Sequence, residues 1–178
     1  ASDAVFIHAL LEARTAWCLA VFQRAVALGD EIIILGDDCA HHGGPMISPK
    51  MWREFVLPCH RRIVESLHVP VIWHSDGNIT KLLPLAIEAG FAGIHGLEPW
   101  SMSLSTVKAE DGEKLVLMGN VDVRLLCDTN LVAVQAEVRR CLEQGGAGGF
   151  MLSTCNSIFS GMNPTAAREF FRYQAEII

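Results

Sequence analysis

The chain alternates between two kinds of hydrophobic pattern. In the longer segments apolar residues recur every three to four positions, which predicts helices, and in the shorter ones they run almost without interruption, which predicts buried strands. We expect helices over about residues 3–28, 49–67, 80–90, 103–110, 131–144 and 164–178, and strands over residues 31–37, 69–74, 92–98, 114–120 and 148–154.

Polar residues mark the helix boundaries. Ser2 or Asp3 can cap the first helix, and Ser48 followed by Pro49 opens the second with a capping side chain and a proline at the first helical position. Every strand is therefore separated from the next by a helix. Apolar strands that do not alternate in polarity and are joined by helices predict a parallel sheet covered on both faces.

Polar and acidic residues follow all five predicted strands. They are Asp37 and Asp38, His74 and Asp76, His95 and Glu98, Asn120 and Asp122, and Cys155 and Asn156. In a (β/α)8 barrel all the carboxyl ends of the strands meet at one face, whereas in a doubly wound sheet only those near the switch point meet. The pattern favours the barrel. Because a whole barrel needs about 250 residues, we expect residues 1–178 to be one domain that holds its C-terminal five strands.

Charge and composition exclude some classes of partner. The formal net charge is −6 and the basic residues form no run, which argues against nucleic acid and membrane partners. We expect a cytoplasmic protein, because the N-terminus lacks the features of a signal peptide and no apolar window is expected to reach the length of a membrane span. The six cysteines contain no CxxC pair, which predicts reduced thiols.

The pentapeptide His74-Ser75-Asp76-Gly77-Asn78 is the most informative motif. A histidine and a carboxylate two residues apart, at the end of a strand, can share a metal ion, or the aspartate can simply anchor the turn by accepting a hydrogen bond. Glu98 and Cys155 end other strands, so nitrogen, oxygen and sulfur donors are expected at one height of the barrel. Zinc accepts this donor set.

Five segments together resemble the uroporphyrinogen decarboxylase superfamily. They are GPMISPKMWREFVLPCHRRIV, HSDGN, GIHGLEP, LMGNVD and STCNSIFSGMNPTAAREFF. In the methylcobamide:coenzyme M methyltransferases of that superfamily, the second segment reads His-x-Cys-Gly-Asn and a further cysteine ends the last strand. The resemblance implies that His74, Glu98 and Cys155 bind zinc. Asp76 replaces the first cysteine, either as an oxygen ligand or as a partner of His74.

The resemblance also implies an activity. We expect a Zn²⁺-dependent enzyme that moves a methyl group from methylcobamide, carried by a separate corrinoid protein, to a thiol or folate acceptor. One alternative is a decarboxylase of porphyrin biosynthesis, although Thr154-Cys155-Asn156-Ser157 stands where decarboxylases carry Gly-His. A second alternative is a non-catalytic half-barrel whose sheet edges pair with another copy, or with the missing N-terminal half.

Several further residues are assigned roles at the strand ends. Asp37 and Asp38 are expected to orient the corrinoid or a substrate amine, or else to cap their loop, and Asp76 joins them as a catalytic candidate. Asn78, Asn120 and Asp122 are candidates for cofactor contacts, with a purely loop-holding role as the alternative for Asn120 and Asp122. His95 is expected to point opposite to its strand neighbour Ile94 and to be a core histidine with satisfied hydrogen bonds. His41 and His42 are expected in a solvated loop, with a place at the pocket rim as the alternative.

Overall fold

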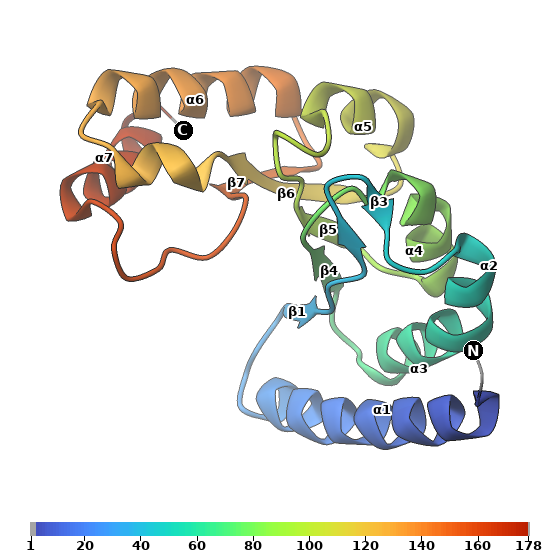
Figure 1. Ribbon diagram of the computed structural model, residues 1–178. Coiled ribbons are helices and arrows are strands. Elements are labelled where there is room, and N and C mark those ends of the chain that lie inside the picture. Colours follow the sequence, from blue (N-terminus) through green and yellow to red (C-terminus); the bar gives the residue numbers. More distant parts are fainter. Residues whose placement is uncertain (1–2, 178) are drawn as a thin grey trace.

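A computed structural model describes residues 3–177 and contains a five-stranded parallel sheet with helices packed outside it (Figure 1). The sheet consists of β1 (Ile33–Gly36), β4 (Val71–Ser75), β5 (Gly93–Gly96), β6 (Val116–Val121) and β7 (Phe150–Thr154), in that order. Every neighbouring pair is parallel. The predicted α/β fold, with parallel strands in chain order, is confirmed.

The helices follow the predicted segments closely. They are α1 (Ala4–Ala27), α2 (Pro49–Met51), α3 (Leu57–Ser66), α4 (Leu83–Ala89), α5 (Leu104–Asp111), α6 (Leu131–Gly145) and α7 (Pro164–Ile177). Asp3 caps α1 by accepting a hydrogen bond from the backbone N–H of Phe6, and Ser48 caps α2 in the same way. The other predicted cap of the first helix, Ser2, and the last residue of the predicted terminal helix, Ile178, lie outside the described residues.

Some local structure was not predicted. A π-helical turn, Trp52–Val56, lies between α2 and α3, just before Pro58. Proline lacks the N–H that a regular helix needs, so a widened turn at this point is physically reasonable. Two short 3₁₀ helices, Thr80–Leu82 and Val123–Cys127, follow β4 and β6.

A small antiparallel hairpin of β2 (Ala40–His41) and β3 (Gly44–Pro45) follows β1 and was also not predicted. It packs against Gly77, whose φ is +77° and at which a Cβ would lie 2.7 Å from the backbone of Ala40 and His41. Only glycine fits there. The backbone N–H of Asn78 also donates to the carbonyl of His41, so the hairpin and the HSDGN loop are held together.

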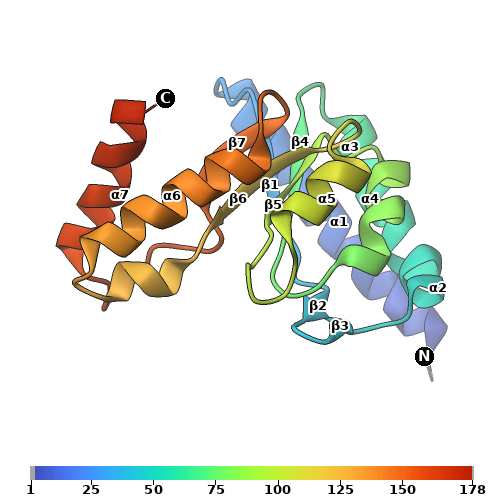
Figure 2. The same cartoon turned by 90° about the horizontal axis from the view of Figure 1, so that it is seen from above.

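The sheet does not close within residues 3–177, and β1 and β7 form its two edges. Figures 1 and 2 show α1 and α3 near the β1 end and α6 and α7 at the β7 end. The core is divided accordingly. One apolar cluster surrounds β1, β4 and β5, a second lies between the β6–β7 end and helices α6 and α7, and Phe150 packs against both.

Helix α1 corrects one expectation from the sequence. By length and composition it is apolar enough to cross a membrane, so the expectation that no segment reaches this length was wrong. Core helices of soluble proteins pass the same test. Two ion pairs, between Glu12 and Arg62 and between Arg14 and Asp37, tie α1 to α3 and to the end of β1, while Phe6 and Trp17 remain exposed.

Candidate metal centre

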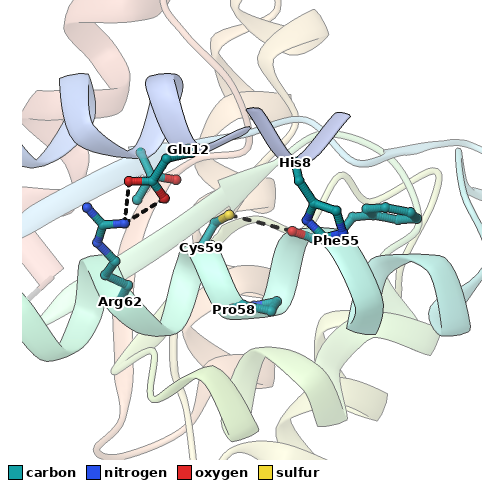
Figure 3. Close-up of a pocket in the computed structure, with 7 residues that line it drawn as sticks. His8, Glu12, Phe55, Pro58, Cys59 and Arg62 are labelled. Atoms are coloured by element: carbon teal, nitrogen blue, oxygen red, sulfur yellow. Dashed lines mark hydrogen bonds and ion pairs between the residues drawn. The ribbon is translucent and has the colours of Figure 1, made fainter. Parts of the chain in front are cut away.

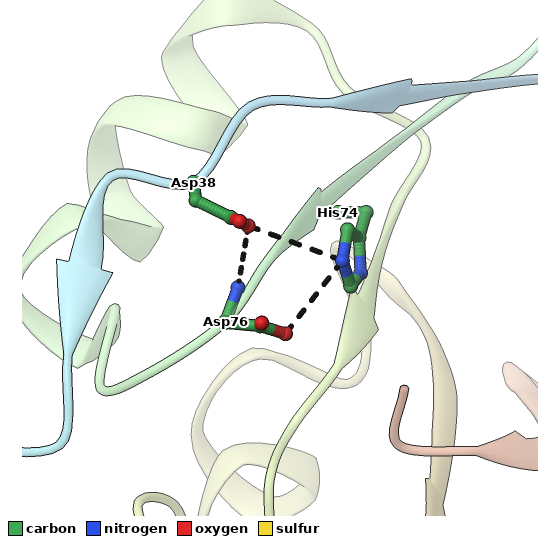
Figure 4. A group of neighbouring side chains, drawn as sticks. All are labelled: Asp38, His74 and Asp76. Atoms are coloured by element: carbon green, nitrogen blue, oxygen red, sulfur yellow. Dashed lines mark hydrogen bonds and ion pairs between the residues drawn. The ribbon is translucent and has the colours of Figure 1, made fainter. Parts of the chain in front are cut away.

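Three side chains converge where β1 and β4 end. Asp38 follows β1, His74 lies in β4 and Asp76 follows β4, and one potential ligand atom from each lies within 4.8 Å of the other two (Figure 4). The His74 Nε2 atom is 3.9 Å from an Asp38 carboxylate oxygen and 3.7 Å from an Asp76 oxygen. Two ligands on a tetrahedral zinc ion would be separated by about 3.4 Å, given metal–ligand distances near 2.0 to 2.2 Å. The two distances from His74 are somewhat longer than this value, and all three ligand atoms lie within 4.8 Å of one another.

Neighbouring groups hold both carboxylates in place. The backbone N–H of Asp76 donates to Asp38 Oδ1 at 2.9 Å, and the Asn156 side-chain amide lies 2.8 and 3.0 Å from the two carboxylate oxygens of Asp76. Asn156 follows β7, so a side chain next to the last strand of the sheet contacts a loop 80 residues earlier in the sequence. The sequence pattern marks Asn156 as a strand-end residue but gives it no role.

His95 lies against His74, a contact that the sequence pattern did not predict. The two are directly paired in the β4–β5 register, and their Nδ1 atoms are 2.8 Å apart. Alternation along β5 places the side chains of His95 and Ile94 on opposite faces of the sheet. Only the register with β4 shows that His95 lies on the same face as His74. The other ring nitrogen, Nε2, lies 3.1 Å from the carbonyl oxygen of Thr154. Burial and the charge of His74 lower the pKa of His95.

Glu98 and Cys155 do not join this cluster. In residues 3–177 the group that could hold a metal ion contains neither of them. Glu98 Oε2 accepts hydrogen bonds from the backbone N–H of Gly77 at 3.0 Å and from the Ser101 hydroxyl at 3.3 Å. The contact with Gly77 anchors the HSDGN loop. The Ser101 hydroxyl also contacts His42 Nδ1 at 3.3 Å, which connects the hairpin to the same network.

Cys155 is fully buried in the second apolar cluster. Cys155 and Asn156 form a bend after β7, in which the Asn156 amide contacts Asp76 while the Cys155 side chain packs in that cluster. Burial raises the pKa of the Cys155 thiol to about 12, so without a metal ion the side chain is a neutral thiol. The structure thus brings together Asp38, His74 and Asp76, and the ligand set of His74, Glu98 and Cys155 stays a prediction.

The two adjacent aspartates lie in different surroundings. Asp37 turns toward the helices, where its carboxylate lies 2.7 Å from His60 Nε2 and 3.1 Å from Arg14. Burial by itself would raise the pKa of Asp37, but the hydrogen bond to His60 and the nearby positive charges outweigh it and lower the pKa. Of the pair, only Asp38 belongs to the candidate metal cluster, and the catalytic role of Asp37 stays a prediction.

The three residues predicted to contact a cofactor each make a hydrogen bond within the protein. Asn78 Oδ1 accepts from the backbone N–H of Thr80, and Asp122 caps the 3₁₀ helix that begins at Val123. Asn120 is completely buried and donates to the carbonyl of Leu97, a non-glycine residue with a φ of +53°. All three side chains make loop-holding contacts, and their contacts with a cofactor stay a prediction.

A further cavity lies away from the strand ends. It has a volume of about 340 Å³ and is situated between α1 and α3 (Figure 3). It is lined by His8, Glu12, Thr15, Phe55, Pro58, Cys59 and Arg62. None of the strand-end residues contributes to it, and the ion pair between Glu12 and Arg62 already satisfies its charges.

Comparison with solved structures agrees with this architecture. A methyltransferase from Methanosarcina mazei superposes with a TM-score of 0.72 at 23% identity, over 85% of this chain and 44% of that one. A dihydropteroate synthetase bound to its product superposes with a TM-score of 0.57 at 16% identity, over 89% of this chain and 62% of that one. At these identities the likeness shows the fold alone.

Sequence comparison identifies the family. A methylated-thiol:coenzyme M methyltransferase from Methanosarcina mazei is 30% identical over 142 residues, which are 78% of this chain and 36% of the relative. The uroporphyrinogen decarboxylase of Azotobacter vinelandii is 29% identical over 179 aligned positions, which are 96% of this chain and 48% of the relative. The chain thus spans less than half the length of either relative. The profile of the uroporphyrinogen decarboxylase (URO-D) family matches residues 2–177, and the chain belongs to this family.

Proposed function

We propose that this chain is the metal-binding part of a methyltransferase that moves a methyl group from a methylated corrinoid protein to a thiol acceptor, with a folate as the other candidate acceptor. The observation that carries the proposal is the convergence of Asp38, His74 and Asp76 at the carboxyl ends of β1 and β4. The similarity to a methylated-thiol:coenzyme M methyltransferase supports the same reaction class.

The donor set fits a divalent metal ion. Imidazole nitrogen and carboxylate oxygen both bind zinc, and a catalytic zinc site typically has three protein ligands and one open position. Asp38, His74 and Asp76 would be the three ligands. When bound, Zn²⁺ would act as a Lewis acid and lower the pKa of an acceptor thiol, which then becomes the nucleophilic thiolate.

The surrounding residues would prepare the site before a metal ion arrives. Asn156 holds both oxygens of Asp76, and the backbone N–H of Asp76 holds Asp38, so the carboxylates lose little freedom on binding. Glu98 anchors the loop through Gly77. We expect the corrinoid protein to dock over the carboxyl ends of the strands, and the free edges of β1 and β7 to be covered by the remaining strands of a barrel or by a second copy of the chain.

A decarboxylase acting on uroporphyrinogen is the second candidate. It is favoured by the extent of the match, because decarboxylases of this family align with 96% of the chain whereas the methyltransferase aligns with 78%. That activity would use the same face to hold a substrate without requiring the Asp38–His74–Asp76 cluster to bind a metal ion.

Metal content and affinity distinguish the candidates. The methyltransferase proposal predicts about one zinc per chain, and His74→Ala should abolish binding while the control His68→Ala, an exposed histidine at the opposite end of β4, leaves it unchanged. Methyl transfer from methylcobalamin to a small thiol should be lost in the same variant. A chain that binds no zinc, or whose affinity is the same in both variants, would contradict the proposal.

A further inference from the structure

His95 makes two contacts that together restrict where its protons lie. Its Nε2 atom is 3.1 Å from the carbonyl oxygen of Thr154, which can only accept a hydrogen bond, so Nε2 must carry a proton. In a neutral imidazole the other nitrogen is then an acceptor. His95 is half-buried, and burial disfavours the charged form.

This arrangement determines the proton on His74. The two Nδ1 atoms are 2.8 Å apart, a distance that requires one of them to donate. Because His95 Nδ1 accepts, His74 Nδ1 must donate. Neutral His74 therefore has no proton on Nε2, and that lone pair faces the carboxylates of Asp38 and Asp76.

The distances on the far side of His74 agree with this tautomer. Its Nε2 atom lies 3.9 and 3.7 Å from the nearest carboxylate oxygens of Asp38 and Asp76, which is too long for a hydrogen bond. Among residues 3–177, no acceptor lies within hydrogen-bond distance of His74 Nε2. One ring lone pair and two carboxylates instead face the same space, an arrangement that suits a cation.

The backbone brings the two rings together. Pairing of β4 with β5 places His74 and His95 opposite each other, with ring centroids 4.8 Å apart. Gly96 follows, with a φ of +108°, and a Cβ there would lie 3.1 Å from the carbonyl oxygen of Ser75 and 3.6 Å from His74 Nδ1. A glycine at this position lets the strands approach without displacing the His74 ring.

We propose that His95 is a positioning residue that holds His74 in the Nδ1–H tautomer and so presents the Nε2 atom of His74 to a metal ion. Ligand histidines usually donate their second ring N–H to a carboxylate, a carbonyl or water. Here another imidazole would take that place, itself oriented by the backbone of β7. The inference rests on the metal site proposed above and adds a residue that does not touch the metal.

Two substitutions separate positioning from packing. His95→Leu removes both hydrogen bonds, whereas His95→Gln keeps an amide oxygen to accept from His74 and an amide N–H to donate to Thr154. We expect the zinc affinity of the leucine variant, measured by competition with a chromogenic chelator, to fall about 10- to 100-fold, the range typical of such supporting partners. The glutamine variant should recover most of that loss.

Nitrogen-15 NMR of the histidine rings in the metal-free protein gives a readout independent of metal. The wild-type His74 ring should be protonated at Nδ1, and this preference should disappear in His95→Leu and persist in His95→Gln. A wild-type ring protonated at Nε2, or equal zinc affinity in all three proteins, would overturn the inference. If the wild type binds no zinc but His74 has the expected tautomer, the metal proposal alone fails.

Discussion

Replacing Cys155 with alanine is the sharpest test of the site geometry. The thiol is fully buried among apolar side chains and lies outside the Asp38–His74–Asp76 group. Removing a buried group of this size costs about 0.8 kcal/mol in transfer free energy. A cavity of about 20 Å³ adds about 0.5 kcal/mol at 24 cal/mol per Å³. The free energy of unfolding should therefore fall by about 1 to 1.5 kcal/mol.

The assay combines unfolding with metal binding. For a protein of this size, a loss of 1 kcal/mol lowers the Tm by about 2 to 4 °C, so Cys155→Ala should unfold a few degrees earlier and at lower urea concentration. Its zinc affinity should equal that of the wild type. Cys141→Ala is the matched control, because Cys141 is equally buried in the same cluster but lies on α6.

The opposite result would refute the reasoning. If Cys155→Ala keeps its stability but loses zinc affinity by tenfold or more, Cys155 is a ligand and the thiol must reach the metal in solution. The ligand set implied by the resemblance to methyltransferases would then be right, and the assignment of Asp38 would be wrong.

Three further predictions concern stability and the loop. Because the folded-state pKa of Asp37 is lowered, its ionised form stabilises the protein above the unfolded pKa, and this contribution is lost as pH falls through the folded value. Urea titrations from pH 7 to 3 should show that Asp37→Asn lowers the free energy of unfolding by about 1.5 to 3 kcal/mol at pH 7 and makes it less dependent on pH. Gly77→Ala should weaken zinc binding in chelator competition, since its Cβ would meet the β2–β3 hairpin, whereas Gly148→Ala, at the same φ of +77° with open space around it, should lose stability alone. Asn120→Ala should lower the free energy of unfolding by about 1 to 3 kcal/mol in urea titrations, because it leaves the buried Leu97 carbonyl without its side-chain donor.

The order of the elements was predictable from the sequence, because hydrophobic periodicity and capping residues are local properties. Asp3 and Ser48 cap the helices that the pattern assigned to them. The alternation of strands and helices then leaves few arrangements other than a parallel sheet. The carboxyl-end location of His74 and Asp76 followed from the same argument.

The direction of individual side chains was not predictable in the same way. Whether Cys155 or Asn156 reaches the site depends on the bend that follows β7, and a bend has no hydrophobic period that a sequence pattern could reveal. Asp37 and Asp38 likewise follow the end of a strand, β1, outside its regular pattern. The contact between His74 and His95 depends on strand register, which pairs residues 21 positions apart and leaves no periodic signal in the sequence.

The two open edges of the sheet affect how this protein should be handled. β1 and β7 each present unpaired N–H and C=O groups along one side, and Ile34 and Met151 in these strands are 45% and 39% exposed. Such edges are templates for pairing with another chain. By mass action, self-association through them would make the observed unfolding midpoint rise with protein concentration. The unfolding midpoints of variants should therefore be compared at one low protein concentration, at which self-association is negligible.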